Sequence, residues 1–169
     1  VCVATAVHDV PGWDVEMVDE NNYRGGPVDD NGLPDHAALQ RERPADVVGL
    51  YGGLTSTIPR LYEIAEQYRQ MGALTLAGGQ HFVEENIADA LDHGVGIIAR
   101  GEGEHTIVDL LKCLDADGDL AEIQGLVFRR DGRTIHTPDR PPLTDFDALP
   151  IPDYSVLRYA RIKIHSISG

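Results

Sequence analysis

The chain has 169 residues, long enough for one domain and an appendage, and 42% of it is hydrophobic, enough for an ordinary core. Its formal net charge of −14, from 28 acidic and 14 basic residues, excludes the clustered basic side chains that bind nucleic acids and disfavours an anionic membrane surface. The sequence shows neither an apolar run of roughly 20 residues that would span a membrane nor a signal-peptide pattern. Its two cysteines, Cys2 and Cys113, indicate a reducing compartment. We therefore expect a cytoplasmic protein without nucleic-acid or membrane partners.

The first 120 residues alternate between helical and strand patterns. Apolar residues at helical spacing run from Val3 to Val10 and end at Pro11-Gly12. The patterns that follow predict strands over 15–18, 46–51, 73–77 and 95–99, and helices over 35–42, from 58 onward, 84–93 and 105–114. The later strands are near-continuous apolar runs, typical of strands buried on both faces. The alternation predicts a doubly wound α/β fold with helices on both faces of a parallel sheet.

The predicted order opens with a helix. A doubly wound domain normally opens with a strand, because a strand and a crossover helix form its repeating unit. We therefore expect a first strand, with its loop, upstream of Val1.

The pattern changes after Leu120. Two alternating stretches, 125–129 and 133–137, flank Asp131-Gly132 and predict a β-hairpin. A proline-rich stretch over 138–152 then predicts an extended linker, and 161–167 predicts one more strand. We therefore expect a domain over residues 1–120, followed by a hairpin and linker over 121–169.

Glycines follow three of the predicted parallel strands: Gly52-Gly53, Gly78-Gly79, and Gly101 with Gly103. Ligands of open parallel sheets bind at the carboxyl ends of the strands, where glycine allows close approach of the backbone. The N–H groups and dipoles of the helices that follow suit a phosphate or an amide. Three such sites along one edge favour a long or flat ligand, although ordinary turn chemistry also places glycine after a strand.

Polar residues beside these glycines are the remaining candidates, each with a plain structural alternative. Thr55, Ser56 and Thr57 offer helix N-cap oxygens. His81, in a Gly-Gly-Gln-His sequence that includes Gln80, is either a contact to a bound ligand, metal included, or a polar loop residue. Glu102 and Glu104 either accept hydrogen bonds from a ligand or stabilise the first turn of a helix.

No catalytic constellation is recognisable, because the sequence lacks a GxSxG elbow, a Walker loop and a GxGxxG turn between a strand and a helix. The other histidines are scattered without metal-ligand spacing, so we expect no zinc site.

Several segments, taken in order, resemble the N-terminal half of cobalamin-dependent radical-SAM enzymes, which include methyltransferases and the anaerobic magnesium-protoporphyrin monomethyl ester oxidative cyclases. The matching segments are 45–50, 77–82 (Ala-Gly-Gly-Gln-His-Phe), 99–104 (Ala-Arg-Gly-Glu-Gly-Glu), the hairpin at 125–132, 147–154 (Asp-Ala-Leu-Pro-Ile-Pro-Asp-Tyr) and 162–169. Together they cover nearly the whole chain, and their order and spacing are more specific than any single segment.

The resemblance implies a Rossmann-like (flavodoxin-like) cobalamin-binding domain with a five-stranded parallel sheet. It also implies a downstream radical-SAM domain in the same polypeptide, with a four-iron four-sulfur cluster and S-adenosylmethionine, that performs methyl transfer or oxidative cyclisation on an unactivated carbon. This chain would bind the corrinoid without being catalytic by itself. By position, the residues that line the cobalamin site would be Thr55, Ser56, Thr57, Gly78, Gly79, Gln80, His81, Gly101, Glu102, Gly103 and Glu104.

The sequence departs from the family's pattern in two respects. It lacks the DxHxxG loop that supplies a cobalt-ligating histidine in methionine-synthase-like domains, which leaves the cobalt ligand open, and it lacks the CxxxCxxC cluster motif. An alternative is a flavodoxin-like or receiver-like interaction module without cobalamin. A receiver needs acids at two strand ends, and only Asp19-Glu20 supplies one of them. A Rossmann-type nucleotide-binding enzyme is a third possibility, but its glycine fingerprint is missing.

Overall fold

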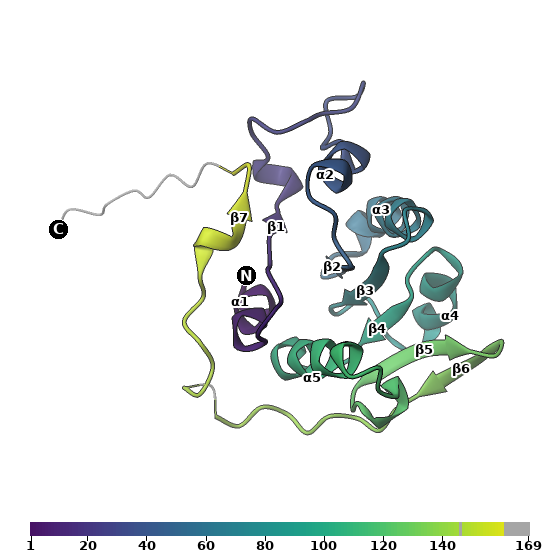
Figure 1. Ribbon diagram of the computed structural model, residues 1–169. Helices are drawn as coiled ribbons and strands as arrows, with labels where there is room; N and C mark the ends of the chain where they lie inside the picture. The colour runs from purple at the N-terminus through teal and green to yellow at the C-terminus, as the bar shows by residue number, and fades with distance from the viewer. Residues whose placement is uncertain (146, 161–169) are drawn as a thin grey trace.

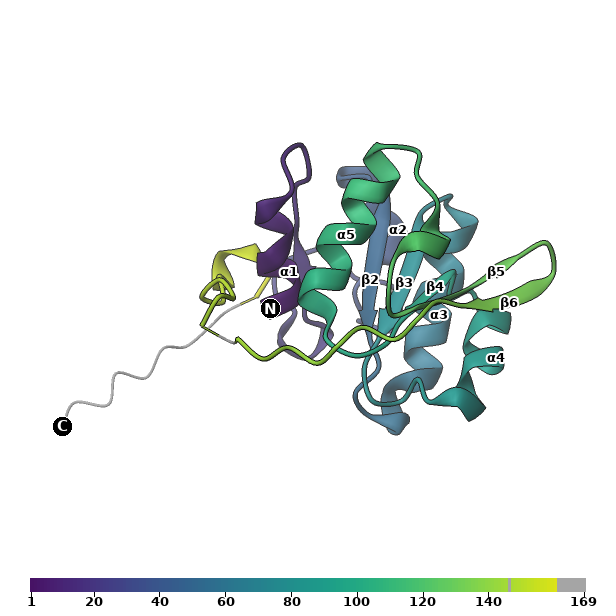
Figure 2. The same ribbon diagram turned by 90° about the horizontal axis from the view of Figure 1, so that it is seen from below.

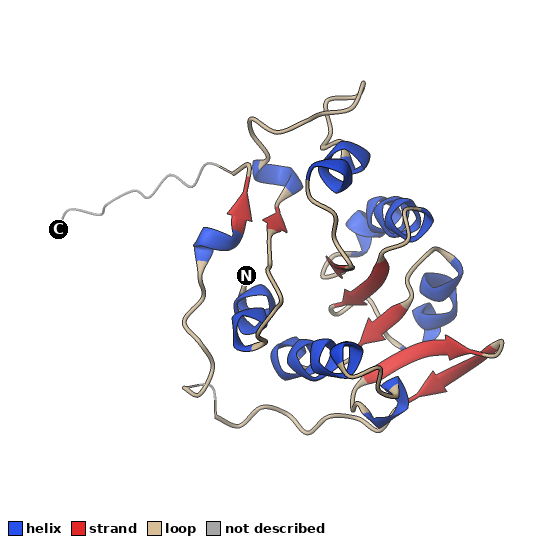
Figure 3. Ribbon diagram, in the orientation of Figure 1, coloured by secondary structure: helices blue, strands red, loops and turns tan. Residues whose placement is uncertain are grey.

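The computed structural model describes residues 1–145 and 147–160, and Figure 1 shows their arrangement. A central sheet lies between two layers of helices; Figure 3 shows the strands in red and the helices of both layers in blue. None of the helices in these residues is long and apolar enough to span a membrane. The doubly wound, Rossmann-like architecture expected from the sequence is confirmed.

The central sheet has the strand order β2-β3-β4-β5-β6. Its strands are β2 (Val47–Tyr51), β3 (Leu74–Gly78), β4 (Ile97–Ala99), β5 (Leu126–Arg130) and β6 (Arg133–His136). The first three are parallel, whereas β5 runs antiparallel to β4 and forms a hairpin with β6. The predicted hairpin is confirmed, with positive φ at both Asp131 and Gly132. It extends the sheet by two antiparallel strands, which differs from the five parallel strands implied by the resemblance.

Two helices cover one face of the sheet, and a third lies beside them. They are α3 (Ile58–Gln70), α4 (Glu84–Asp92) and α2 (His36–Glu42), which packs against α3. The apolar stripe predicted for α3 is buried: Ile58, Leu61 and Ala65 form one cluster with Ala77 and Ile98 of the sheet. Helix α3 therefore follows its sequence periodicity.

The opposite face is covered by α1 (Cys2–Ala6), which continues as a 3₁₀ turn over Val7–Asp9, and by α5 (Gly103–Asp115). Val10 and Leu110 belong to the cluster that also includes Leu76 and Ile97 of the sheet. The views in Figures 1 and 2 both place α1 beside α5 on this face. Short 3₁₀ turns at Glu20–Asn22, Thr55–Thr57, Leu120–Glu122 and Tyr154–Val156 complete the described elements.

After the hairpin, the chain runs back past α5 to α1, as Figure 2 shows. We call residues 153–160 the docked segment. The backbone N–H of Asp153 donates to Oγ1 of Thr5 at 2.8 Å, and β7 (Leu157–Arg158) pairs in parallel with β1 (Met17–Val18). The strand predicted over 15–18 is therefore only two residues long and pairs with β7 instead of the central sheet. The strand predicted over 161–167 lies outside the described residues, and the predicted domain boundary at residue 120 stays a prediction.

Candidate functional site

The predicted site residues all lie in or next to the loops that follow the parallel strands β2, β3 and β4. We call these loops, residues 52–57, 78–83 and 100–104, the carboxyl rim. The carboxyl ends of parallel strands share one edge of a sheet, so this topology brings the predicted residues to one side of the molecule. They are Thr55, Ser56, Thr57, Gly78, Gly79, Gln80, His81, Gly101, Glu102, Gly103 and Glu104. Their role in binding stays a prediction.

The first two rim loops contact each other through their backbones. The N–H of Gly52 donates to the carbonyl of Gly78 at 2.7 Å, and the N–H of His81 donates to the carbonyl of Gly52 at 2.9 Å. Gly79 has φ +120°, and a Cβ at this position would lie 2.7 Å from the carbonyl carbon and oxygen of Gly52. The contact between the two loops therefore already requires glycine at position 79.

The third rim loop differs from the first two. Gly101 has φ +74°, yet a Cβ there would have no neighbour within 4 Å. At Gly103, a Cβ would lie 2.8 Å from Cγ2 of Val3, so α1 packs against the start of α5. Gly101 is therefore the rim glycine that faces open space, whereas Gly103 accommodates α1.

The three helices that begin at the rim have no side-chain cap. The side chains of the N-cap residues of α3, α4 and α5, which are Thr57, Val83 and Glu102, accept no hydrogen bond from the helix. The expectation that the threonine–serine run caps α3 is wrong, because Oγ1 of Thr57 donates to the carbonyl of Leu54 at 2.8 Å. Ile58 of α3 donates to the carbonyl of Thr55, Pro59 has no N–H, and Asn86 of α4 donates to the carbonyl of Val83. The other first-turn N–H groups of these helices have no side-chain cap and stay available to a ligand.

Elsewhere in the described residues, aspartates do cap the starts of helices. Asp35 accepts from the N–H of Ala38 at the start of α2. Asp19, Asp119 and Asp153 accept in the same way at the starts of three 3₁₀ turns. The missing caps at the rim are therefore not a general property of this acidic chain.

His81 is held by its backbone, whereas its imidazole has no hydrogen-bond partner among the described residues. The carbonyl of His81 accepts from Nδ2 of Asn86 at 2.8 Å, and the imidazole packs edge-to-face on Phe82 with 5.5 Å between the ring centroids. The backbone hydrogen bonds thus hold the main chain of His81 in place, whereas both ring nitrogens stay available to a ligand. Both alternatives for His81, a ligand contact or a polar loop residue, stay open.

Three large apolar side chains at the rim are exposed, and sequence reasoning missed them. Tyr51 is 79% exposed at the end of β2, Leu54 is 66% exposed, and Val83 is 50% exposed just before α4. Because they lie outside the buried stripes of α3 and α4, the helical periodicity does not account for them. Apolar residues at turn positions, where polar residues are usual, are the sequence signal that would have found them.

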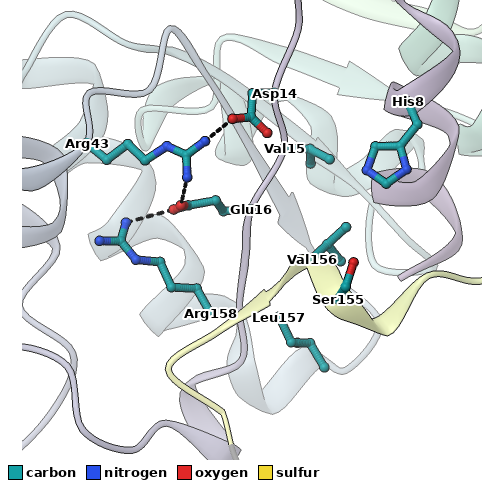
Figure 4. A pocket seen from close by; sticks show the side chains of 9 residues that line it. All are labelled: His8, Asp14, Val15, Glu16, Arg43, Ser155, Val156, Leu157 and Arg158. Carbon is teal, nitrogen blue, oxygen red and sulfur yellow. Dashed lines mark hydrogen bonds and ion pairs between the residues drawn. The ribbon is translucent and has the colours of Figure 1, made fainter.

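A cavity of about 370 Å³ lies elsewhere, between the docked segment and the loop that leads to β1. Figure 4 shows that its charged side chains contact one another: Arg43 contacts Asp14 and Glu16, and Arg158 contacts Glu16 at 2.7 Å. Arg158 also pairs with Glu42 at 2.9 Å. Because these charges already neutralise each other, the cavity has little to offer a charged ligand.

A second cavity, of about 270 Å³, reaches the third rim loop. Glu102, His105 and Arg140 contribute to its lining. Arg140 is held by α5, through Oγ1 of Thr106 at 3.1 Å and the carboxylate of Asp109. This hollow and the open space at Gly101 lie in the same part of the rim.

Comparison with known proteins gives a consistent result. A model described as the B12 binding domain matches residues 1–111. The uncharacterized methyltransferase PH0819 of Pyrococcus horikoshii is 27% identical over 158 residues, which cover 91% of this chain and 33% of that protein. The anaerobic magnesium-protoporphyrin IX monomethyl ester cyclase of Synechocystis is 28% identical over 145 residues, 84% of this chain and 27% of the cyclase.

Solved structures show the same fold. The radical S-adenosylmethionine methyltransferase TsrM of Kitasatospora setae, with cobalamin and an iron–sulfur cluster bound, aligns with a TM-score of 0.64 at 19% identity, covering 88% of this chain and 27% of TsrM. The chain thus spans about a third or less of these relatives. These matches favour cofactor binding over a receiver-like module, and the acids that a receiver needs are engaged, since Asp19 caps a 3₁₀ turn and Glu20 contacts Arg60 and His36.

Proposed function

The chain belongs to the B12 binding domain family, and we propose that its carboxyl rim holds cobalamin for a radical-SAM enzyme. The observation that carries the proposal is the set of three uncapped helix starts at one edge of the sheet. A corrinoid carries amide groups around a macrocycle with apolar faces. Backbone N–H groups suit the amides, and the exposed side chains of Tyr51, Leu54 and Val83 suit the macrocycle.

The predicted residues have separable roles in this proposal. Gly78, Gly79 and Gln80 shape the second loop, and Gly101 leaves room beside the start of α5. Thr55, Ser56, His81, Glu102 and Glu104 supply polar atoms near the uncapped helix starts. The cobalt ligand is not assigned.

The activity of the whole enzyme extends beyond this chain. Bound cobalamin supplies a cobalt centre for methyl transfer or for oxidative cyclisation on an unactivated carbon. The residues described here bind and orient the cofactor and shield it from water. A downstream radical-SAM domain in the same polypeptide would provide the iron–sulfur cluster and the S-adenosylmethionine site.

Retention of hydroxocobalamin after desalting, measured by visible absorbance, tests the proposal. Leu54→Lys places a charge on an exposed rim position and should weaken retention by at least about tenfold, or ~1.4 kcal/mol. Val28→Lys is the matched control, because Val28 is an apolar residue that is 55% exposed away from the rim. Colourless wild-type protein, or equal retention by both variants, would contradict the proposal.

A further inference from the structure

The loop between β1 and α2 contains the single Asn-Gly pair of the sequence, Asn31-Gly32. The pair lies at the tip of a small hairpin that is closed by an antiparallel bridge between Val28 and Pro34, and Figure 1 shows this loop extending outward past α2. Asn31 and Gly32 are both exposed. Asparagine is a thermolabile residue, and a following glycine has no side chain to keep its nitrogen away from the asparagine amide. The tip therefore presents a reactive pair to water.

Backbone hydrogen bonds fold this tip into a tight turn. The N–H of Gly32 donates to the carbonyl of Asp29 at 3.0 Å, and the N–H of Asp29 donates to the carbonyl of Leu33 at 2.8 Å. Gly32 has φ +78°, the left-handed conformation that ends a short hairpin loop built on a type I turn. The nitrogen that would attack the side chain of Asn31 is thus already engaged as a hydrogen-bond donor.

The carboxylate of Asp29 holds the same turn closed. Its Oδ1 accepts from the N–H of Asn31 and from the N–H of Leu33, both at 2.9 Å. The hydrogen bond from Leu33, helped by those from Asn31, lowers the pKa of Asp29 below its usual 3.8. The side chain of Asp29 is therefore an ionised acceptor at neutral pH, and it ties together the residues on both sides of Gly32.

Loss of the Asn31 amide, or deamidation, requires this turn to open. The nitrogen of Gly32 bonds to Cγ of Asn31, the bond from Cγ to Nδ2 breaks, and Nδ2 leaves as ammonia with the proton that Gly32 gives up. Water then opens the resulting cyclic imide on either side, which yields aspartate or isoaspartate without any oxidation or reduction. While Gly32 donates to Asp29, its nitrogen is not free to attack, so the reaction proceeds from the locally open loop.

We propose that Asn31 is a site of spontaneous deamidation and that the side chain of Asp29 limits its rate by keeping the turn closed. Isoaspartate at position 31 inserts an extra carbon atom into the backbone, so the hydrogen bonds of Gly32 and Leu33 to Asp29 are lost in the product. The modification is a slow covalent step that opens the loop before α2. It does not depend on cobalamin.

The other three asparagines serve as internal references. Asn21, Asn22 and Asn86 are followed by asparagine, tyrosine and isoleucine, whose side chains hinder attack by the next backbone nitrogen. The side-chain amides of Asn22 and Asn86 also donate hydrogen bonds. We therefore expect deamidation at Asn31 before any of these three positions reacts.

Peptide mapping by mass spectrometry tests the proposal on protein held at mildly alkaline pH, with chromatography to resolve the aspartate and isoaspartate products. Asp29→Ala should speed the loss of the Asn31 amide by about tenfold or more, because two hydrogen bonds that close the turn are removed. Asp30→Ala is the matched control. It removes the same charge from an exposed side chain that makes no hydrogen bond within residues 1–145 and 147–160, and should change the rate by less than about threefold.

Equal rates in wild type and Asp29→Ala would overturn the proposal, as would an equally large effect of Asp30→Ala. Deamidation at Asn86 as fast as at Asn31 would also contradict it. Wild type in urea gives a test that does not rely on the folding of a variant. Unfolding should speed deamidation at Asn31 by about tenfold or more, and an unchanged rate would show that the folded turn does not limit the reaction.

Two further variants separate the hydrogen bonds from other effects. Asp29→Asn keeps an acceptor oxygen without the charge and should stay closer to wild type than to Asp29→Ala, whereas a rate equal to that of Asp29→Ala would contradict a role for the hydrogen bonds. Asn31→Gln should abolish the modification at position 31, and a persistent product in this peptide would assign it to another residue.

Discussion

The carboxyl rim and the docked segment differ in whether side chains cap their helix starts and pair their charges. At the docked segment, Asp153 caps its own 3₁₀ turn and Arg158 pairs with Glu16 and Glu42. At the rim, α3, α4 and α5 begin without a side-chain cap, although the chain has 28 acidic residues to choose from. Aspartates serve as local caps away from the rim, whereas the helices that begin at the rim have no side-chain cap.

The comparison also separates two kinds of rim glycine. Gly79 is required by the contact between the first two loops, whereas Gly101 faces open space. Both have positive φ, so backbone conformation alone does not tell them apart. Only the neighbours of a Cβ distinguish a glycine that packs from one that leaves room.

The largest expected effect comes from substituting these two glycines by alanine. Gly79→Ala combines an unfavourable φ with a methyl group 2.7 Å from the Gly52 carbonyl, and should lower the free energy of unfolding by about 3 kcal/mol. Gly101→Ala meets only the unfavourable φ and should cost about 1 kcal/mol. Urea unfolding followed by circular dichroism measures both, and equal losses would show that the loops adjust without cost.

The next effect concerns helix capping in the two regions. Asp35→Ala removes the cap of α2 and should lower the free energy of unfolding by about 1 kcal/mol, with cobalamin retention unchanged. Thr57→Asp would add a cap to α3 and should raise that free energy by about 0.5–1 kcal/mol while weakening cobalamin retention.

The variants Asp35→Ala and Thr57→Asp are expected to change the free energy of unfolding in opposite directions, and only Thr57→Asp is expected to weaken cobalamin retention. A cap at position 57 occupies donors that the cofactor would otherwise use, so stability and binding change in opposite directions. If Thr57→Asp stabilises the protein and leaves cobalamin retention unchanged, the start of α3 lies outside the binding site.

The fold was predictable from sequence wherever apolar periodicity and turn chemistry agreed. The stripe of α3, the doubly buried strands β3 and β4, and the Asp131-Gly132 hairpin all appear as expected. The short pairing of β1 with β7 was not predictable, because it joins segments about 140 residues apart in sequence through only two residues each. Local patterns carry no information on such a contact.

The sequence predicted which loops gather at one edge of the sheet but not how they pack, and their role in binding stays a prediction. The strand-end glycines indicate the loops of the carboxyl rim, because the topology of parallel strands alone gathers those loops. The packing role of Gly79 and the hydrogen bond from Thr57 back to Leu54 depend on how two loops meet in space. The contacts of Glu20 were not predictable either, because α2 and α3 bring His36 and Arg60 to within hydrogen-bond distance of it only in the folded chain.

The smallest expected effect concerns Glu20 and acid pH. Burial acts to raise the pKa of Glu20, but hydrogen bonds from Arg60 and His36 and their positive charge outweigh it, so the pKa lies below its usual 4.5. A carboxyl whose pKa is lowered by folding contributes stability that is complete above the unfolded pKa and is lost as the pH falls through the folded pKa. The free energy of unfolding of the wild type should therefore decline below about pH 4.5. In Glu20→Gln this decline should be smaller, by less than ~1 kcal/mol.

Glu63→Gln is the matched control for this variant. Glu63 contacts the same arginine, at 3.2 Å, but its side chain is 66% exposed, so solvent screens the pair. Urea midpoints of wild type and Glu20→Gln should therefore differ near pH 7 and converge as the pH falls toward 3, whereas those of wild type and Glu63→Gln should nearly coincide over the whole range. If the urea midpoint of Glu20→Gln declines in acid as steeply as that of wild type, the Glu20–His36–Arg60 cluster does not stabilise the fold. The difference between the uncapped helix starts at the rim and the rest of the molecule would then depend on the aspartate caps alone.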